Sequence, residues 1–239
     1  MTQKSILITG CSSGIGLDAA RGLRAAGWRV FASCRKPADC ARLRDEGFDS
    51  PLIDYADPQS IVTGLTEVLD ATGGTLDALY NNGAYACPGA VEDLPVAALR
   101  AIFETNLFGW HELTRRVIPV MRAAGEGRII QNSSILGFVG LPFRGAYTAS
   151  KFAIEGLSDT LRLELRDTDI CISLIEPGPV LSLFRHNALL QLEQHIDYQN
   201  SIHREKYLRV LNRLKKEGPA VAFTLPPEAV LKRVIHALE

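Results

Sequence analysis

The sequence contains no long hydrophobic run, almost no net charge and no leader-like N-terminus. Its 26 Lys and Arg residues nearly balance 27 Asp and Glu residues, which leaves a formal net charge of -1. This balance supplies no general field that would attract nucleic acid or an acidic membrane surface. No stretch reaches the roughly 20 consecutive apolar residues of a membrane-spanning helix, and the first residues lack the apolar region of a signal peptide. We therefore expect a cytoplasmic protein with no membrane span and no nucleic-acid partner.

The cysteines form no recognisable pattern either. There are five of them, an odd number, and none lies in a CxxC pair or at zinc-binding spacing. This arrangement predicts free thiols in a reducing compartment and no metal site.

The composition, 46 % hydrophobic and 22 % charged, is that of a globular chain that buries a sizeable core. Short apolar runs alternate with helical patterns, and nearly continuous apolar runs are typical of parallel strands covered on both faces. The predicted strands are Ser5–Thr9, Arg29–Cys34, Pro51–Asp54, Leu76–Asn81, Arg128–Ser133 and Ile170–Glu176. The predicted helices between them are Gly14–Ala26, Pro58–Thr72, Pro95–Ala124 and Thr148–Asp167.

This order predicts an α/β fold of the Rossmann type, a doubly wound parallel sheet with helices on both faces. No linker or repeat interrupts residues 1–239, so we expect a single dinucleotide-binding and catalytic domain. Segment 179–223 is less regular, with helix-like pieces near Ser182–Gln194 and Ser201–Glu217. Its leucines could cover a pocket, which suggests a substrate lid and a hydrophobic substrate. Pro226 and Pro227 then open a last helical pattern.

A glycine-rich turn follows the first predicted strand and opens the first predicted helix. Its residues are Thr9, Gly10, Cys11, Ser12, Ser13, Gly14, Ile15 and Gly16. Glycine lets the backbone approach a pyrophosphate, and the helix N-terminus offers unpaired N–H groups to phosphates. The same residues match G-x-S-x-G, the nucleophile elbow of hydrolases. Since that elbow follows several strands in its own fold, and almost nothing precedes Ser12, we favour the dinucleotide interpretation.

The end of the second predicted strand bears on cofactor choice. An NAD site usually has an acid here to hold the ribose 2′-hydroxyl, whereas this chain has Arg35 and Lys36. A guanidinium pairs with a 2′-phosphate, so the sequence favours NADP. A solvated basic loop is the alternative.

The pair Tyr147 and Lys151 indicates the chemistry. The four-residue spacing places both side chains on one helix face, where an ammonium favours the phenolate and lowers the pKa of the tyrosine. Such a tyrosine exchanges a proton with a substrate oxygen. Ser134, at the end of a strand, could hold that oxygen, and Asn106 is a polar residue inside an apolar helix pattern whose amide needs partners, of which water is one. A surface helix pair is the alternative for Tyr-x-x-x-Lys alone.

These motifs together resemble the short-chain dehydrogenase/reductase family over nearly the whole chain. The catalytic tetrad of that family matches Asn106, Ser134, Tyr147 and Lys151. Its cofactor contacts match the Thr9–Gly16 turn, Asp54 near the adenine, the Asn82-Gly83 segment, Pro177 and Gly178 beside the nicotinamide, and Ser182 near its carboxamide. The Cys34–Pro37 and Glu176–Pro179 segments resemble the branch of 17β-hydroxysteroid and retinol dehydrogenases, with many bacterial oxidoreductases.

The resemblance implies an NADP-dependent oxidoreductase that interconverts a carbonyl and an alcohol. Tyr147 would be the general acid or base, Lys151 would lower its pKa and bind the nicotinamide ribose, Ser134 would position the carbonyl, and Asn106 would hold a relay water. It also implies a homodimer or homotetramer, with the small residues Ala149, Ala153 and Gly156 as one packing face.

Two departures from the family pattern keep alternatives open. The family usually has Asn-Asn-Ala-Gly where this chain has Asn81-Asn82-Gly83-Ala84, and its seventh strand is not expected before Glu239, which leaves six. A non-catalytic NADP-binding sensor or scaffold is therefore a second hypothesis. An epimerase or dehydratase is a third, disfavoured because we see no large C-terminal substrate domain.

Overall fold

The computed structural model describes residues 3–219 and 221–239. Residue 220, which falls inside the expected lid segment, lies outside the described residues, as do residues 1 and 2.

A parallel sheet forms the centre of the molecule, in the order β2-β1-β3-β4-β5. Its strands are β1 (Ser5–Ile8), β2 (Arg29–Ala32), β3 (Ala78–Asn81), β4 (Glu126–Asn132) and β5 (Asp169–Ile175). Leu7 of β1 lies between Phe31 of β2 and Leu79 of β3. The chain therefore winds to one side of β1 and then to the other, which confirms the doubly wound class and creates a crevice at the carboxyl ends of β1 and β3.

The described part of the sheet has five strands rather than the six expected, because Pro51–Asp54 does not form a continuous strand. It makes one isolated bridge, between Leu52 and Cys34 just after β2, and a second bridge joins Asp49, ahead of the segment, to Phe31 of β2. Pro51 has no N–H to donate, and the Asp54 N–H is already bonded to the Ser60 hydroxyl at 2.8 Å. The pairing therefore ends after the bond from Ile53 N to Cys34 O at 3.0 Å.

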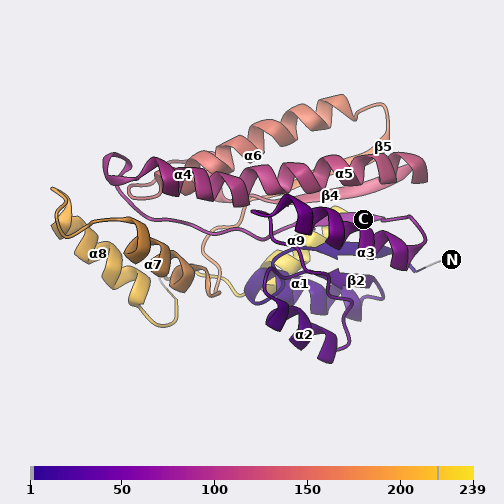
Figure 1. Ribbon diagram of the computed structural model, residues 1–239, viewed down its shortest axis with the longest axis horizontal. Helices are drawn as coiled ribbons and strands as arrows, with labels where there is room; N and C mark the ends of the chain where they lie inside the picture. The colour runs from indigo at the N-terminus through magenta and orange to yellow at the C-terminus, as the bar shows by residue number, and fades with distance from the viewer. Residues whose placement is uncertain (1–2, 220) are drawn as a thin grey trace.

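Alternating side chains of the strands build a separate core on each face of the sheet. Ile6 and Ile8 pack in the core beneath α1 (Gly14–Ala25) and α9 (Glu228–Leu238). Leu7 packs in the opposite core with α3 (Pro58–Thr72), α5 (Gly109–Ala124) and α6 (Gly145–Glu164). Figure 1 shows α5 and α6 together on one side of the sheet, with α1 on the other.

The helix expected over Pro95–Ala124 is present from Val96 to Ala124. It consists of α4 (Val96–Phe103), a π-helical turn η2 (Glu104–Phe108) and α5, which follow one another without a gap. π-turns inside α-helices occur frequently at functional sites, and this one contains Asn106. Three further elements are not evident from the sequence. They are α2 (Pro37–Asp45), whose apolar pattern is weak, and the short turns η1 (Val91–Asp93) and η3 (Ile135–Gly137).

The lid segment contains α7 (Phe184–His195) and α8 (Arg204–Lys215), which lie together at one end of the molecule (Figure 1). Its two ends are held side by side, because Leu181 N bonds to Leu225 O and Leu225 N bonds to Pro179 O, both at 3.0 Å. Tyr207 Oη anchors α8 by donating to Asp93 Oδ2 and accepting from Ala90 N, each at 2.8 Å.

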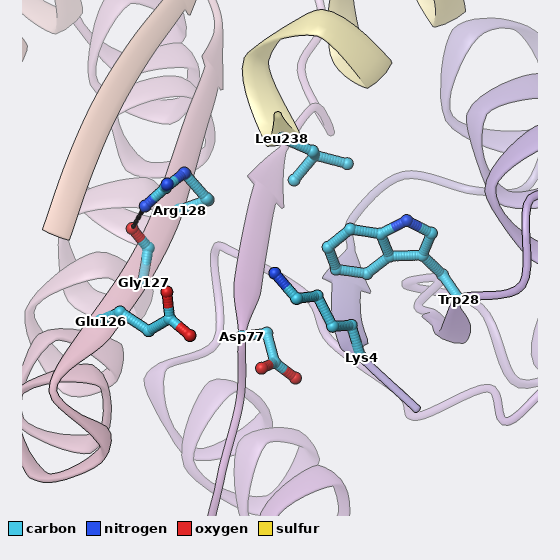
Figure 2. A pocket seen from close by; sticks show the side chains of 7 residues that line it. All are labelled: Lys4, Trp28, Asp77, Glu126, Gly127, Arg128 and Leu238. Carbon is cyan, nitrogen blue, oxygen red and sulfur yellow. Dashed lines mark hydrogen bonds between the residues drawn. The ribbon is translucent and has the colours of Figure 1, made fainter. Parts of the chain in front are cut away.

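A small cavity lies at the opposite end of the strands from this lid. Figure 2 shows its lining residues, which come from the starts of β1 to β4 and the end of α9: Lys4, Trp28, Asp77, Glu126, Gly127, Arg128 and Leu238. Its volume of about 10 Å³ holds no more than about one water molecule. It is therefore no candidate for a ligand site.

Within the described residues, we find no helix long and apolar enough to cross a membrane.

The contact between α5 and the segment after Asp54 gives a test of the packing. A Cβ at Gly109 would lie 2.4 Å from Tyr55 Cβ and 2.5 Å from Tyr55 O. We predict that Gly109→Ala lowers the free energy of unfolding by about 1 to 3 kcal/mol, because the backbones must separate, as measured by urea denaturation. The matched control is Gly140→Ala, where a Cβ meets no atom within 4 Å and the change should stay within about 0.5 kcal/mol. Equal stabilities of the two variants would contradict this packing.

Candidate active site

The glycine-rich turn is built so that other segments touch its backbone. Gly10 has φ 69°, and a Cβ there would lie 2.6 Å from Gly83 Cα. Gly14 has φ 59°, and a Cβ there would lie 2.9 Å from Ser182 Cβ. Both positions require glycine for conformation and for space. The turn therefore brings Gly83 and the entry to the lid next to the start of α1.

The start of α1 offers its backbone N–H groups to a ligand. Ser13 occupies the N-cap position without a side-chain hydrogen bond to the helix, and no acidic residue lies in the first turn. Ser12 precedes it and its carbonyl accepts a 2.8 Å bond from Arg42 Nη2, while Ile15 and Gly16 form the first turn itself. A helix N-terminus of this kind binds phosphate, so these residues fit the pyrophosphate of a dinucleotide.

Thr9 ties together the segments at the carboxyl ends of the strands. Its Oγ1 accepts from Asn82 N at 2.9 Å and from Gly83 N at 3.2 Å, and lies 2.7 Å from Tyr55 Oη. Asn82 is held further, because its Oδ1 accepts a 3.0 Å bond from Asn132 Nδ2 at the end of β4. The Asn82-Gly83 segment is thus held by hydrogen bonds to Thr9, after β1, and to Asn132, at the end of β4.

The residues expected at the adenosine end lie on the rim. Arg35 and Lys36 are exposed and follow β2. Burial raises the pKa of Tyr85 to about 12, and Arg35 is close enough for its charge to act in the opposite direction. Asp54 lies beyond them, with Oδ1 accepting from Ala56 N at 3.0 Å. Both groups of residues thus follow segments at the carboxyl ends of β2 and its neighbouring chain.

Tyr147 and Lys151 lie in the first half of α6, and both are buried. Ser134 occupies the N-cap of η3, where its Oγ accepts from Leu136 N at 3.1 Å, and its hydroxyl is close enough to Tyr147 to lower the pKa of the phenol. Pro177 borders this group, since its carbonyl accepts from Ile135 N at 3.2 Å. The phenol, the ammonium and the serine hydroxyl converge as the sequence predicts.

The ammonium of Lys151 is enclosed by protein. Its Nζ donates to Asn132 O at 2.7 Å and lies 4.1 Å from the centroid of the Trp110 ring. Burial lowers the pKa of Lys151 to about 7, and the carboxylate of Glu155 acts in the opposite direction. A buried lysine loses charge readily because the low-dielectric interior disfavours the ammonium.

Burial also shifts the pKa of the Tyr147 phenol. Burial raises its pKa above the ordinary value, and the Ser134 hydroxyl lowers it only in part. Burial outweighs the Ser134 hydroxyl and favours the neutral phenol. The lowering of this pKa by Lys151 stays a prediction.

Asn106 is fully buried in the π-turn. Its Oδ1 accepts from Tyr85 N at 3.1 Å, and its Nδ2 donates to Tyr85 O at 2.9 Å and lies 3.1 Å from Ser150 Oγ. The sequence correctly predicts that the amide needs partners, and the structure supplies them from the protein.

The lid covers this group. Phe184 of α7 packs edge-on against Tyr147 with ring centroids 5.3 Å apart. Tyr147 itself belongs to the apolar cluster that includes Leu192, Tyr207 and Leu211 of the lid. The 178–182 segment connects Pro177 to this lid, with Gly178 exposed and Ser182 against Gly14.

Sequence reasoning missed several residues of this region, namely Arg42, Tyr55, Trp110 and Glu155. Trp110 and Glu155 carried a signal, since each is four residues from a singled-out position, Asn106 and Lys151. The other two reach the site only through the tertiary fold.

Comparison with known proteins matches residues 4–192 to the family model described as short chain dehydrogenase. The chain is 42 % identical over 235 residues to the uncharacterized oxidoreductase YbbO of Escherichia coli (strain K12), covering 98 % of this chain and 81 % of that protein. It is 35 % identical over 199 residues to retinol dehydrogenase 8 of Homo sapiens, covering 79 % of this chain and 63 % of that protein.

A solved structure shows the same architecture with a cofactor. A single-substitution variant of actinorhodin polyketide ketoreductase with NADPH superposes with a TM-score of 0.80 at 28 % identity, covering 99 % of this chain and 90 % of that chain.

The Thr9 contacts can be tested without any ligand. We predict that Thr9→Val, which keeps the shape but removes the acceptor of two backbone N–H groups, lowers the free energy of unfolding by about 2 kcal/mol in urea denaturation. The control is Thr66→Val on the exposed side of α3, where the hydroxyl bonds only to Val62 O and the change should stay within about 0.5 kcal/mol. A Thr9→Val protein as stable as the control would show that these bonds do not hold the segment.

Proposed function

The chain belongs to the short-chain dehydrogenase family, and we propose that it is an NADP(H)-dependent oxidoreductase that interconverts a carbonyl and an alcohol. The observation that carries the proposal is the convergence of Tyr147, Lys151 and Ser134 beside a glycine turn at a helix N-terminus. Membership of the family supports the general statement that the protein is an oxidoreductase with a nicotinamide cofactor. The choice of NADP and the residue roles are our inference.

The cofactor would lie along the crevice. The turn from Thr9 to Gly16 would hold the pyrophosphate, Asp54 and the Asn82-Gly83 segment the adenosine side, and Pro177, Gly178 and Ser182 the nicotinamide side. Arg35 and Lys36 stand where an NAD site usually has an acid, and they favour a 2′-phosphate. When bound, the cofactor supplies or accepts the hydride.

The residues of the chain would handle the proton and the orientation of the substrate. The Tyr147 hydroxyl donates its proton to the carbonyl oxygen, and Ser134 holds that oxygen by a hydrogen bond. Lys151 binds the ribose hydroxyls and supports the charge that develops on the phenol oxygen. Asn106 fixes the Tyr85 backbone and the first half of α6 through Ser150.

The direction in which burial shifts the pKa of Tyr147 agrees with the role of an acid. Burial favours the neutral phenol, which is the form that donates a proton to a carbonyl oxygen in reduction.

The lid suggests the chemistry of the substrate. The lid residues around Tyr147 are mainly apolar and aromatic, and one relative is named a retinol dehydrogenase. We therefore propose a small, hydrophobic carbonyl compound or alcohol as the substrate. We also propose a cytoplasmic homodimer or homotetramer that packs through α6, and a single catalytic domain with segment 179–223 as its lid.

A second candidate is a non-catalytic NADP-binding sensor or scaffold. The observation that favours it is Phe184, whose ring covers Tyr147. Tight NADPH binding without turnover across a panel of ketones, aldehydes and hydroxysteroids would support it.

The catalytic role of Tyr147 is tested by removing its hydroxyl. With a carbonyl substrate identified by NADPH absorbance, we predict that Tyr147→Phe lowers kcat by at least about 100-fold while NADPH affinity is retained. The control is Tyr80→Phe, because the Tyr80 hydroxyl is buried without a hydrogen-bond partner among the described residues. Full activity of Tyr147→Phe would refute the assigned role.

Cofactor choice is tested by reversing the charge on the rim. We predict that Arg35→Asp weakens NADPH binding by about 10- to 100-fold, the value of a charge-assisted contact, and leaves NADH binding nearly unchanged, as measured by calorimetry. Arg166→Asp, in the turn between α6 and β5, makes the same change of net charge far from the crevice and should weaken neither. Equal losses for both cofactors would rule out a contact with the 2′-phosphate.

A further inference from the structure

Trp110 has no role in the proposed mechanism, yet it lies between its parts. It is the second residue of α5, directly after the π-turn that contains Asn106, and it is fully buried. A buried tryptophan is ordinarily a core residue that finds one partner for its N–H. Here the indole ring contacts Lys151 of α6. The indole N–H contacts Gly83, in the segment after β3.

The first contact is with the catalytic lysine. Lys151 Nζ lies 4.1 Å from the centroid of the Trp110 ring, closer than the 5.6 Å to the ring of Tyr147. A cation over an indole face is stabilised by the ring quadrupole, and more strongly when water is excluded. Since Lys151 is 1 % exposed, the ring replaces part of the hydration that the ammonium has lost.

The second contact is with the cofactor-facing segment. Trp110 Nε1 donates a 2.7 Å hydrogen bond to Gly83 O. Gly83 is the residue exchanged with Ala84 relative to the family pattern, and its backbone packs on Gly10 of the glycine turn. Tyr55 supports the indole from the side, with ring centroids 6.2 Å apart. Trp110 thus fixes the carbonyl of a residue that touches the phosphate turn.

We propose that Trp110 is a positioning residue, which holds the Lys151 ammonium with its ring and the Asn82-Gly83-Ala84 segment with its N–H. This segment, here called the cofactor wall, and the lysine thereby keep a fixed position relative to each other. The part of this inference that concerns the cofactor rests on the proposed function. The part that concerns Lys151 is a property of the protein alone.

Other groups also face Lys151 and bear on its titration. On α6 these are Tyr147, which burial keeps neutral, and Glu155, whose charge favours the ammonium. From β4 the Asn132 carbonyl accepts its hydrogen bond. Glu176, beyond the end of β5, is close enough to Glu155 for the two charges to repel. Removing the indole leaves all of these in place, so a change in the pKa of Lys151 reports on the ring.

The first experiment follows the Lys151 Cε resonance of ¹³C-lysine-labelled protein against pH, assigned by its loss in Lys151→Met. We expect a pKa of about 7 in the natural sequence, consistent with its burial. Trp110→Leu should lower it by about one pH unit, and Trp110→Phe, which keeps an aromatic face, by clearly less. Leu and Phe both lack the N–H, so the comparison isolates the ring face.

Two outcomes would overturn the proposal that the ring positions Lys151: an equal pKa of Lys151 in the Leu and Phe variants, or a pKa that is unchanged or raised in both. Trp110 would then be a core residue only. If Trp110→Leu does not fold, the Trp28→Phe protein serves instead, because Trp110 is then the sole tryptophan. Its fluorescence should change through the pKa of Lys151, and the change should vanish in Lys151→Met. Persistence of the transition in Lys151→Met would equally overturn the inference.

The second experiment measures NADPH and NADH affinity of the Trp110→Phe protein. Loss of the bond to Gly83 O should weaken both by about five-fold, unlike Arg35→Asp, which should discriminate between them. Undiminished affinity would refute the link to the cofactor wall. If the natural sequence binds neither nicotinamide, the proposed function fails, while the Lys151 titration still decides the ring contact.

Discussion

A positively charged side chain held inside the protein is the constraint on which the active-site region depends. An ammonium withdrawn from water is costly unless it finds polar partners, and Lys151 finds the Asn132 carbonyl, the Trp110 ring and the field of Glu155. These come from β4, α5 and α6, so the three elements must keep their relative positions. The same burial lowers the pKa of Lys151, and the carboxylate of Glu155 acts against this shift.

The second constraint lies at the carboxyl ends of β1 and β3. There the backbone hydrogen bonds between the strands end, and hydrogen bonds to side chains take their place. Thr9 Oγ1 receives the N–H groups of Asn82 and Gly83, and Asn82 in turn holds Asn132, whose carbonyl binds Lys151. The Gly83-Ala84 exchange fits this arrangement. Gly83 has an ordinary φ, and a Cβ there would make only van der Waals contact at 3.4 Å. Glycine is therefore not required at position 83, and the order of the two small residues leaves the wall intact.

The lid is joined to the site by packing and by a strained residue. Phe143 has φ 63°, the one non-glycine residue with positive φ in the described chain, and such a conformation is uncommon for a bulky side chain. Its ring packs edge-on against Tyr207 at 4.9 Å, and Tyr207 is anchored to Asp93. The loop just before Tyr147 is thus packed against α8.

The sequence by itself determined the doubly wound class, the glycine turn and the shared helix face of Tyr147 and Lys151, because apolar periodicity and short spacings are local properties. Only the tertiary structure decided what depends on burial and on contacts between distant residues. The helix expected over Pro95–Ala124 contains a π-helical turn at Asn106, whose amide pairs with the distant Tyr85 backbone, and Pro51–Asp54 pairs too briefly to count as a strand. Burial, which no local pattern reveals, sets the pKa of Tyr147 and of Lys151. Trp110 meets Lys151 and Gly83 only after three separate segments have packed together.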